Sequence, residues 1–267
     1  MNCMKVLYSC LIILVTLAAS AQDLKVTYIA NEGVLLEGGG KKAMIDALFD
    51  DFYKDYLSPS EATVEQMMTS QSPFDQVDLI MTTHFHRDHF EANLTGNFLK
   101  NHQESRLLSS EQVKGELESK YVDYDKVKTQ IKGHQRGVHT LQDNINGLKV
   151  YSFFINHAGG ERTAHIENMG FIIEIGGKRV LHLGDADMNP ERFREVDLAK
   201  YNIDVALVPY WYMSSDEGMD IINNHIKAKD LIGIHYPKAP SPSALSQIKE
   251  NYPKATVFQK TRTEVQY

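Results

Sequence analysis

The sequence predicts an α/β protein in which two β-sheets pack face to face with helices on the outside. Strand-like apolar runs concentrate near residues 24–47, 77–83, 148–183 and 204–209, and helix-like segments lie between them. The chain has 267 residues, of which 42% are hydrophobic, so it can bury one substantial core. No composition break, internal repeat or low-complexity tract divides it. We therefore expect a single domain over residues 22–267.

Residues 1–21 have the pattern of a secretory signal peptide. Lys5 gives a positive start, residues 6–18 are apolar, and Ala19-Ser20-Ala21 is a small-residue cleavage site. The apolar run is too short for a retained membrane anchor, and it continues past Cys10, which argues against lipid attachment there. We therefore expect an exported protein, periplasmic or secreted, whose mature chain begins at Gln22.

The mature chain would be acidic and free of cysteine. Both cysteines, Cys3 and Cys10, precede Gln22, so disulfides and thiolate metal ligands are excluded. Loss of residues 1–21 removes one lysine and no acidic residue, which leaves 27 basic and 35 acidic residues and a net charge of −8. Such a chain is poorly suited to bind the phosphates of nucleic acid. We expect a small-molecule substrate and no nucleic-acid partner.

The first part of the chain reads as a meander followed by a helix. Residues 24–49 form short strands, with turns at Gly33 and at Gly38-Gly39-Gly40. Ser58-Pro59-Ser60-Glu61 predicts a helix start in which Ser58 is the cap and proline takes the first position. A buried strand follows at residues 77–81.

Helices dominate the predicted structure after that strand. Residues 90–101 space their apolar side chains at helical intervals, and Ser109-Ser110-Glu111-Gln112 opens a helix over residues 113–121. The polar stretch 102–147 reads as a helical insertion. Its histidines, which we expect on the surface, are His102, His134 and His139.

The second half returns to strands. Residues 148–156 form an apolar strand, and residues 170–181 form a hairpin through Gly176-Gly177. Another strand is expected at residues 205–208, and a helix-like segment follows that carries His225 on its surface. Ser241-Pro242 opens the last helix before a final strand at residues 256–258.

The feature that points to chemistry is the segment His84-x-His86-x-Asp88-His89, which follows the strand at residues 77–81. Imidazole and carboxylate are ligands that zinc and similar ions select. In an extended segment His84 and His86 project to the same side, so they can bind one ion together. Asp88 and His89 point differently, which suits them to a second ion. The pattern predicts a metal site instead of a histidine-rich surface loop.

This motif resembles the signature of the metallo-β-lactamase-fold hydrolases, and the resemblance spans residues 24–267. The family places a lone His, then an Asp after a Gly, then a last His downstream of the motif. His157, Asp185 and His235 match these positions, and each lies just beyond an apolar run. The resemblance implies an αββα sandwich of two mixed sheets. The branch with lactonase-like and phospholipase-like members is the most similar.

The resemblance implies seven metal ligands and two divalent ions, zinc first, with manganese or iron as alternatives. The ligands are His84, His86, Asp88, His89, His157, Asp185 and His235. Two close ions share a hydroxide that serves as the nucleophile at neutral pH. Asp185 would bridge the ions, and Asp88 would also accept the proton of the attacking water. Because enzymes that destroy β-lactams generally lack this bridging Asp, a true β-lactamase is not expected.

Some histidines and acids compete for these roles. His165 is an alternative to His157, but it lies in a polar stretch, so we expect it to contact substrate together with Arg162. His182 would point away from the site and support it from outside the ligand set. Asp187 competes with Asp185, which is the residue that follows the Gly.

The reaction is less defined than the site. The resemblance implies cleavage of an ester, lactone, amide or phosphodiester bond. Pro209-Tyr210-Trp211-Tyr212-Met213 contains the only Trp and is a candidate wall for a substrate pocket, although packing under a loop explains it equally well. Two alternatives stay open: a di-iron oxidoreductase on the same fold, and a non-catalytic metal-binding protein.

Overall fold

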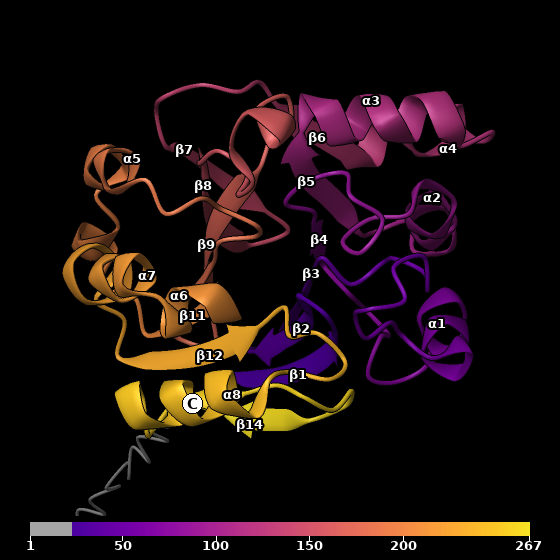
Figure 1. Ribbon diagram of the computed structural model, residues 1–267. Helices are drawn as coiled ribbons and strands as arrows, with labels where there is room; N and C mark the ends of the chain where they lie inside the picture. The colour runs from indigo at the N-terminus through magenta and orange to yellow at the C-terminus, as the bar shows by residue number, and fades with distance from the viewer. Residues whose placement is uncertain (1–22) are drawn as a thin grey trace, which may run out of the picture.

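The computed structural model describes residues 23–267, so the predicted signal segment with its two cysteines, and Gln22, lie outside the described residues. Two seven-stranded mixed sheets pack face to face with helices on both outer sides (Figure 1), which confirms the predicted fold class. Among residues 23–267, no helix is both long and apolar enough to cross a membrane.

The first sheet combines an antiparallel meander with parallel strands. β14, β1, β2 and β3 pair antiparallel, whereas β3, β4, β5 and β6 pair parallel. Its strands, in spatial order, are β14 (Glu264–Gln266), β1 (Lys25–Ala30), β2 (Gly33–Gly38), β3 (Lys41–Ile45), β4 (Leu79–Met81), β5 (Arg106–Ser110) and β6 (Ile131–His134).

The second sheet has the same design. β7, β8, β9 and β10 pair antiparallel, and β10, β11, β12 and β13 pair parallel. Its strands, in spatial order, are β13 (Thr256–Val257), β12 (Asp230–Ile234), β11 (Val205–Pro209), β10 (Lys178–His182), β9 (Met169–Ile175), β8 (Leu148–Phe154) and β7 (Leu141–Ile145). The carboxyl ends of parallel strands in an open sheet are where α/β proteins usually place their sites.

Three apolar layers hold the sandwich together. The middle layer lies between the sheets and includes Leu36, Leu79, Ile173 and Leu207, all fully buried. The two outer layers lie between each sheet and its helices. Alternate residues of a strand face opposite sides, so the central strands are apolar on both faces.

Each sheet has its own set of helices on the outer face (Figure 1). The first sheet is covered by α1 (Glu61–Met68), α2 (Ala92–Asn101), α3 (Glu111–Lys120) and α4 (Tyr124–Val127), and the second by α5 (Pro190–Val196), α6 (Tyr210–Ser214), α7 (Asp216–Asp220), a π-helical turn (Ile221–Ile226) and α8 (Pro242–Asn251). Short 3-10 turns lie at Lys128–Gln130, Gly160–Thr163 and Leu198–Tyr201.

The helix starts agree with the sequence with one exception. Ser110 caps α3 by accepting from the amide of Val113, and Pro242 takes the first turn of α8, as predicted. The cap of α1 is Ser60 and not Ser58, because the Ser60 hydroxyl accepts from the Thr63 amide at 3.2 Å. Ser58 lies before the cap and donates to Asp51 instead.

Residues 102–147 are not a helical insertion, which corrects the prediction. α3, α4 and a 3-10 turn occur there, but β5 and β6 extend the first sheet and β7 begins the second. β6 and β7 are the outermost strands, so each has a neighbour on one side only and carries few apolar residues. Their polar composition hid them from an analysis based on apolar runs.

Three of the four histidines expected on the surface are wholly or partly covered. His102 is buried, stacks on Phe98 at 3.8 Å between ring centroids, and contacts the Met67 carbonyl through Nε2 at 2.8 Å. His134 and His225 are half-buried. His139 is exposed as predicted.

Candidate metal centre

The seven predicted ligands come together where several strands end. His84, His86, Asp88 and His89 follow β4, and His157 follows β8 and pairs with Ala186 in an isolated bridge. Asp185 and His235 follow β10 and β12. Both sheets therefore contribute ligands, and all but His86, which is partly exposed, are buried. The ligand atoms fall into two groups: His84, His86, His157 and Asp185, and Asp88, His89 and His235.

The first group is a triangle of imidazole nitrogens closed by a carboxylate. His84 Nε2 and His157 Nε2 lie 3.0 and 3.1 Å from His86 Nδ1 and 3.3 Å from each other. Asp185 Oδ2 lies 3.3 Å from His157 Nε2. Four ligands at zinc distances of about 2.0–2.1 Å would lie about 3.3 Å apart at the corners of a tetrahedron. The group has the size of a zinc-type site.

Hydrogen bonds on the outer sides of the rings determine which nitrogens lack a proton. The Thr83 hydroxyl donates to Asp46, so His84 Nδ1 donates to Thr83 at 3.0 Å. His157 Nδ1 donates to the Ala158 carbonyl at 2.5 Å. In the neutral rings His84 Nε2 and His157 Nε2 therefore both present lone pairs and cannot bond to each other. A cation bound by both lone pairs would remove the repulsion between them.

The second group contains two imidazoles and the carboxylate of Asp88, and Asp185 of the first group also reaches it. His235 Nε2 lies 3.5 Å from Asp88 Oδ2 and 3.3 Å from Asp185 Oδ1. His89 Nε2 lies 3.7 and 3.5 Å from the same two oxygens. Asp185 Oδ1, His89 Nε2 and His235 Nε2 are buried without a hydrogen-bond partner among the described residues. Asp185 thus turns one oxygen toward each group, as a bridging carboxylate does.

Burial and neighbouring charges give the histidines of the two groups different protonation states. Burial lowers the pKa of His84 well below its usual value and that of His86 to about 4, so both rings are neutral and free to bind a cation. Burial opposes protonation of His89 too, but Asp185 and Asp88 raise the pKa of His89 to about 10. In the ion-free protein His89 therefore holds a proton that a bound metal must replace.

The family can be assigned from the sequence itself. Residues 42–236 match the model of the β-lactamase superfamily domain, which is more than half of the chain. The chain belongs to the β-lactamase superfamily. The match contains all seven candidate ligands described above and ends one residue after the last of them, His235.

A sequence relative agrees with this membership, and a solved structure shows the same fold. The chain is 25% identical over 222 residues to a metal-dependent hydrolase of Staphylococcus haemolyticus. The alignment covers 81% of this chain and 87% of the relative. The metallo-β-lactamase fold protein YhfI of Bacillus subtilis aligns with a TM-score of 0.61 at 14% identity, over 92% of this chain and 100% of that one. The predicted family, fold and enzyme class, a metal-dependent hydrolase, are confirmed.

The same fold also occurs in an enzyme of another class. CmlA, a diiron β-hydroxylase of Streptomyces venezuelae, aligns with a TM-score of 0.60 at 15% identity. The alignment covers 92% of this chain and 54% of CmlA. Members of this superfamily therefore have to be distinguished by their sites, because the fold alone does not define the reaction.

Two buried acids, Asp46 and Glu32, lie at the site although the sequence analysis did not assign them to it. Asp46 follows β3 and accepts from the Thr83 amide, the Thr83 hydroxyl and His89 Nδ1, so it orients the rings of His84 and His89. Its position after an apolar strand is the signal that could have identified it. Glu32 lies in the turn between β1 and β2, fully buried beside Asp185 and His235. In the sequence, the signal that could have identified Glu32 was a single acid within an apolar segment.

His182 supports the site from outside the ligand set. Its Nδ1 accepts from the Gly184 amide at 3.1 Å, so its Nε2 donates to the Glu32 carbonyl at 3.0 Å. This placement agrees with the expected supporting role.

Arg162 and His165 are not brought to the ligands. Both are exposed, on and just after the 3-10 turn Gly160–Thr163, and His165 contacts Gln112 through its carbonyl. Their predicted contact with substrate stays a prediction. Trp211, by contrast, lies beside the centre, with its ring 5.1 Å from that of His235.

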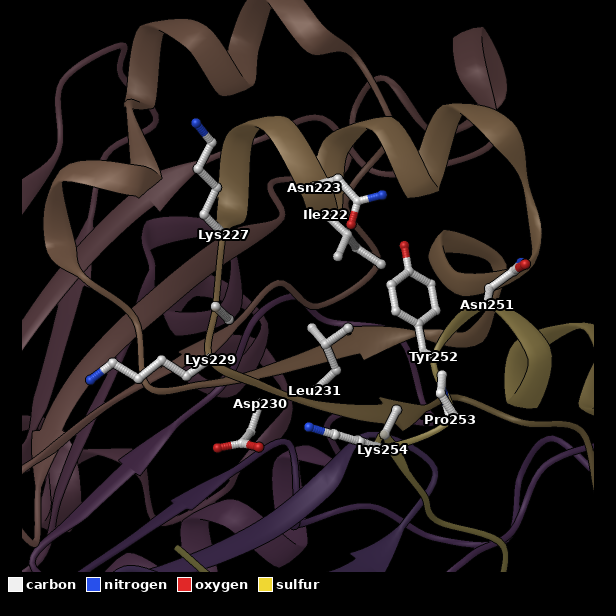
Figure 2. Close-up of a pocket in the computed structure, with 12 residues that line it drawn as sticks. Ile222, Asn223, Lys227, Lys229, Asp230, Leu231, Asn251, Tyr252, Pro253 and Lys254 are labelled. Atoms are coloured by element: carbon white, nitrogen blue, oxygen red, sulfur yellow. The ribbon is translucent and has the colours of Figure 1, made fainter.

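The pocket in Figure 2 is separate from this centre. It has a volume of about 510 Å³ and is lined by Lys229, Asp230 and Leu231 at the start of β12, together with Tyr252 and Lys254 after α8. His235 follows the opposite end of β12. None of the predicted ligands lines this pocket, so it is not the site of the metal chemistry.

Proposed function

We propose that this chain is a dinuclear metal-dependent hydrolase that cleaves an ester, lactone, amide or phosphodiester bond of a small molecule. One observation carries the proposal: Asp185 directs Oδ2 to the three-histidine group and Oδ1 to the group of Asp88, His89 and His235. Three imidazoles and a carboxylate suit zinc, and manganese or iron are the alternatives for the more acidic second group.

The residues divide the work of hydrolysis among them. A pair of divalent ions supplies a nucleophile at neutral pH and polarises the oxygen of the bond to be cleaved. Asp88 Oδ2 faces His89 and His235 and accepts from Asn31 Nδ2 at 3.2 Å, which leaves Oδ1 to accept the proton of the attacking water. Asp46 keeps the ring of His89 in the orientation that ligation needs.

Aromatic side chains suggest which part of a substrate the protein recognises. The rings of Tyr56 and Trp211 lie 4.5 and 5.1 Å from that of His235. Phe52 and Tyr53, on the same loop as Tyr56, are 52% and 41% exposed. Exposed aromatic residues beside a polar centre favour a substrate with an apolar group next to the bond that is cleaved.

Metal analysis of the purified protein, followed by a panel of chromogenic esters, lactones and phosphodiesters, tests the proposal. Two divalent ions and turnover that chelation abolishes would support it. Asp185→Ala should abolish activity and release at least one ion, because it removes the carboxylate that contacts both groups. Asp187→Ala is the matched control, since Asp187 lies two residues away and belongs to neither ligand group. Full occupancy in the Asp185 variant contradicts the bridge.

The di-iron alternative rests on the likeness to CmlA. Iron in the purified protein together with oxygen consumption would favour it over hydrolysis. A protein that binds no metal and turns over no substrate would support the non-catalytic alternative.

We also propose that the protein is exported and that its mature form begins at Gln22. The support is the order of charge, apolar run and small residues in positions 1–21. The intact mass of the exported protein measures the cleavage site. A mass that includes residues 1–21 would rule the proposal out.

A further inference from the structure

A buried carboxylate under the proposed metal centre has no hydrogen-bond partner within residues 23–267. Glu32 is 0% exposed, and neither Oε1 nor Oε2 has a hydrogen-bond partner among the described residues. Its ion-pair neighbours within residues 23–267 are His89 Nδ1 and His182 Nδ1, each 3.9 Å from Oε2. A buried carboxylate that accepts no hydrogen bond is strongly unfavourable.

Neither histidine donates a hydrogen bond to this carboxylate as the site is arranged. His89 Nδ1 donates to Asp46 Oδ2 at 2.9 Å, so its proton is already used. His182 Nδ1 accepts from the Gly184 amide and therefore has no proton to give. A neutral, protonated Glu32 would still leave both of its oxygens without a partner.

Glu32 belongs to two groups of possible ligand atoms, which differ in whether the other atoms already have hydrogen-bond partners. One group is Glu32, Asp46 and His182, and the other is Glu32, Asp185 and His235. Asp46 and His182 already have hydrogen-bond partners. In the other group Asp185 Oδ1 and both nitrogens of His235 are buried without partners, like both oxygens of Glu32. The unpartnered atoms therefore lie together on the side of the second ion.

We infer that Glu32 is an additional ligand of the second ion, beside Asp88, His89, Asp185 and His235. The inference rests on the proposed dinuclear centre. Three carboxylates and two imidazoles then hold the second ion, whereas three imidazoles and the shared Asp185 hold the first. Oxygen-rich sites suit manganese and iron better than imidazole-rich sites do, so the two positions differ in the metal that they prefer.

The local fold holds Glu32 in this place. It lies in the two-residue turn between β1 and β2, next to Asn31, whose side chain donates to Asp88. The backbone amide of His235 donates to the Asn31 carbonyl, and His182 Nε2 donates to the Glu32 carbonyl. Both sheets therefore fix the turn from which the Glu32 side chain reaches the centre.

Two substitutions separate ligation from a general effect of charge. Glu32→Gln removes the charge at nearly constant volume, and Glu32→Asp keeps the charge but shortens its reach. Both should weaken binding of the second ion by at least about tenfold and leave the first ion unchanged, as measured by chelator competition and metal content. Glu37→Gln is the matched control, because Glu37 on β2 pairs with Lys25 on the neighbouring strand β1 and belongs to neither ligand group.

The results separate the inference from the proposed function. A wild-type protein without two divalent ions would overturn both. Two ions in the wild type with unchanged affinity in Glu32→Gln, or wild-type affinity in Glu32→Asp, would overturn the inference alone. A crystal structure of the metal-loaded wild type decides independently of how the variants fold. A Glu32 oxygen about 2.0–2.2 Å from the second ion supports ligation, and one beyond about 3 Å contradicts it.

Discussion

Hydrogen bonds on the outer side of the rings orient three of the five proposed histidine ligands. Thr83 holds His84, Asp46 holds His89, and the Ala158 carbonyl holds His157. Such outer partners fix which nitrogen is bare and where it points, and their loss commonly costs 10–100-fold in metal affinity. The geometry of the centre thus depends on residues that never touch an ion.

His157 and His165 give a direct test of which histidine after β8 is a ligand. His157→Ala removes one corner of the imidazole triangle, so metal affinity should fall by at least about 10–100-fold. His165→Ala should keep both ions and lower turnover only if the exposed ring contacts substrate. Metal content and kcat of the two variants provide the measurement. One ion lost from the His165 variant and none from the His157 variant would reverse the assignment.

The sequence predicted the candidate ligands that follow apolar runs and missed Glu32, which reaches the proposed second ion from a turn. His84, Asp185 and His235 each end a buried strand, so their positions were visible in the pattern. Glu32 lies in a two-residue turn, and nothing in its spacing relates it to Asp185 or His235. Only tertiary structure brings these distant residues together.

At the level of elements, close packing of helices on the first sheet depends on a glycine in α2. A Cβ at Gly96 would lie 2.4 Å from the ring of Tyr121, so only glycine fits this contact. The same glycine weakens α2 as an isolated helix. The close packing of Tyr121 on the helix offsets this loss of helix stability.

Alanine substitutions at two helical glycines should change stability in opposite directions. Gly96→Ala should lower the free energy of unfolding by about 1–3 kcal/mol, because Tyr121 must move. Gly115→Ala in α3 is the matched control, since a Cβ there meets nothing within 4 Å. It should raise stability by about 0.5–1 kcal/mol through helix propensity. Denaturant unfolding measures both, and equal shifts would contradict the packing argument.

The strongly apolar elements were predictable, and the polar outer strands were not. The hairpin of β9 and β10 through Gly176-Gly177 combines buried side chains with a glycine turn, so periodicity and turn chemistry agree. β6 and β7 carry Lys132, His134 and Asp143 on outermost strands. Their pairing is decided by backbone hydrogen bonds and by contacts between the sheets, which no local pattern encodes.

For the molecule as a whole, the two sheets are linked at one edge by a polar contact. β6 is the last strand of the first sheet, and β7 is the last strand of the second. Asp143 on β7 accepts from Lys132 Nζ and contacts His134 Nε2 at 2.7 Å, both on β6. The side chain of Asp143 is only 5% exposed, so this pair is more than a surface ion pair.

The pKa of Asp143 makes this contact sensitive to acid. Burial opposes the charged carboxylate, but hydrogen bonds from Lys132 and His134 outweigh burial and lower the pKa of Asp143 below its ordinary value. Its contribution to stability is therefore fully present above the unfolded-state pKa of about 3.9 and is lost as the pH falls through the lower folded-state value.

Asp143→Asn should consequently destabilise the protein at neutral pH and matter less in acid. We expect a loss of about 1–2 kcal/mol at pH 7, because the usual cost of removing a hydrogen bond to a charged group is about 1.5–3 kcal/mol and solvent screens the half-exposed Lys132. The difference from the wild type should begin to shrink below about pH 4, where the carboxyl becomes protonated in the unfolded chain, and should shrink further as the pH falls through the lower folded-state pKa. Urea unfolding between pH 3 and 7 measures the free energy of unfolding of both proteins.

Asp125→Asn, at an exposed acid paired with Lys128, is the control and should change stability little. A difference that stays constant with pH would show that the charge of Asp143 does not hold this edge of the two sheets together.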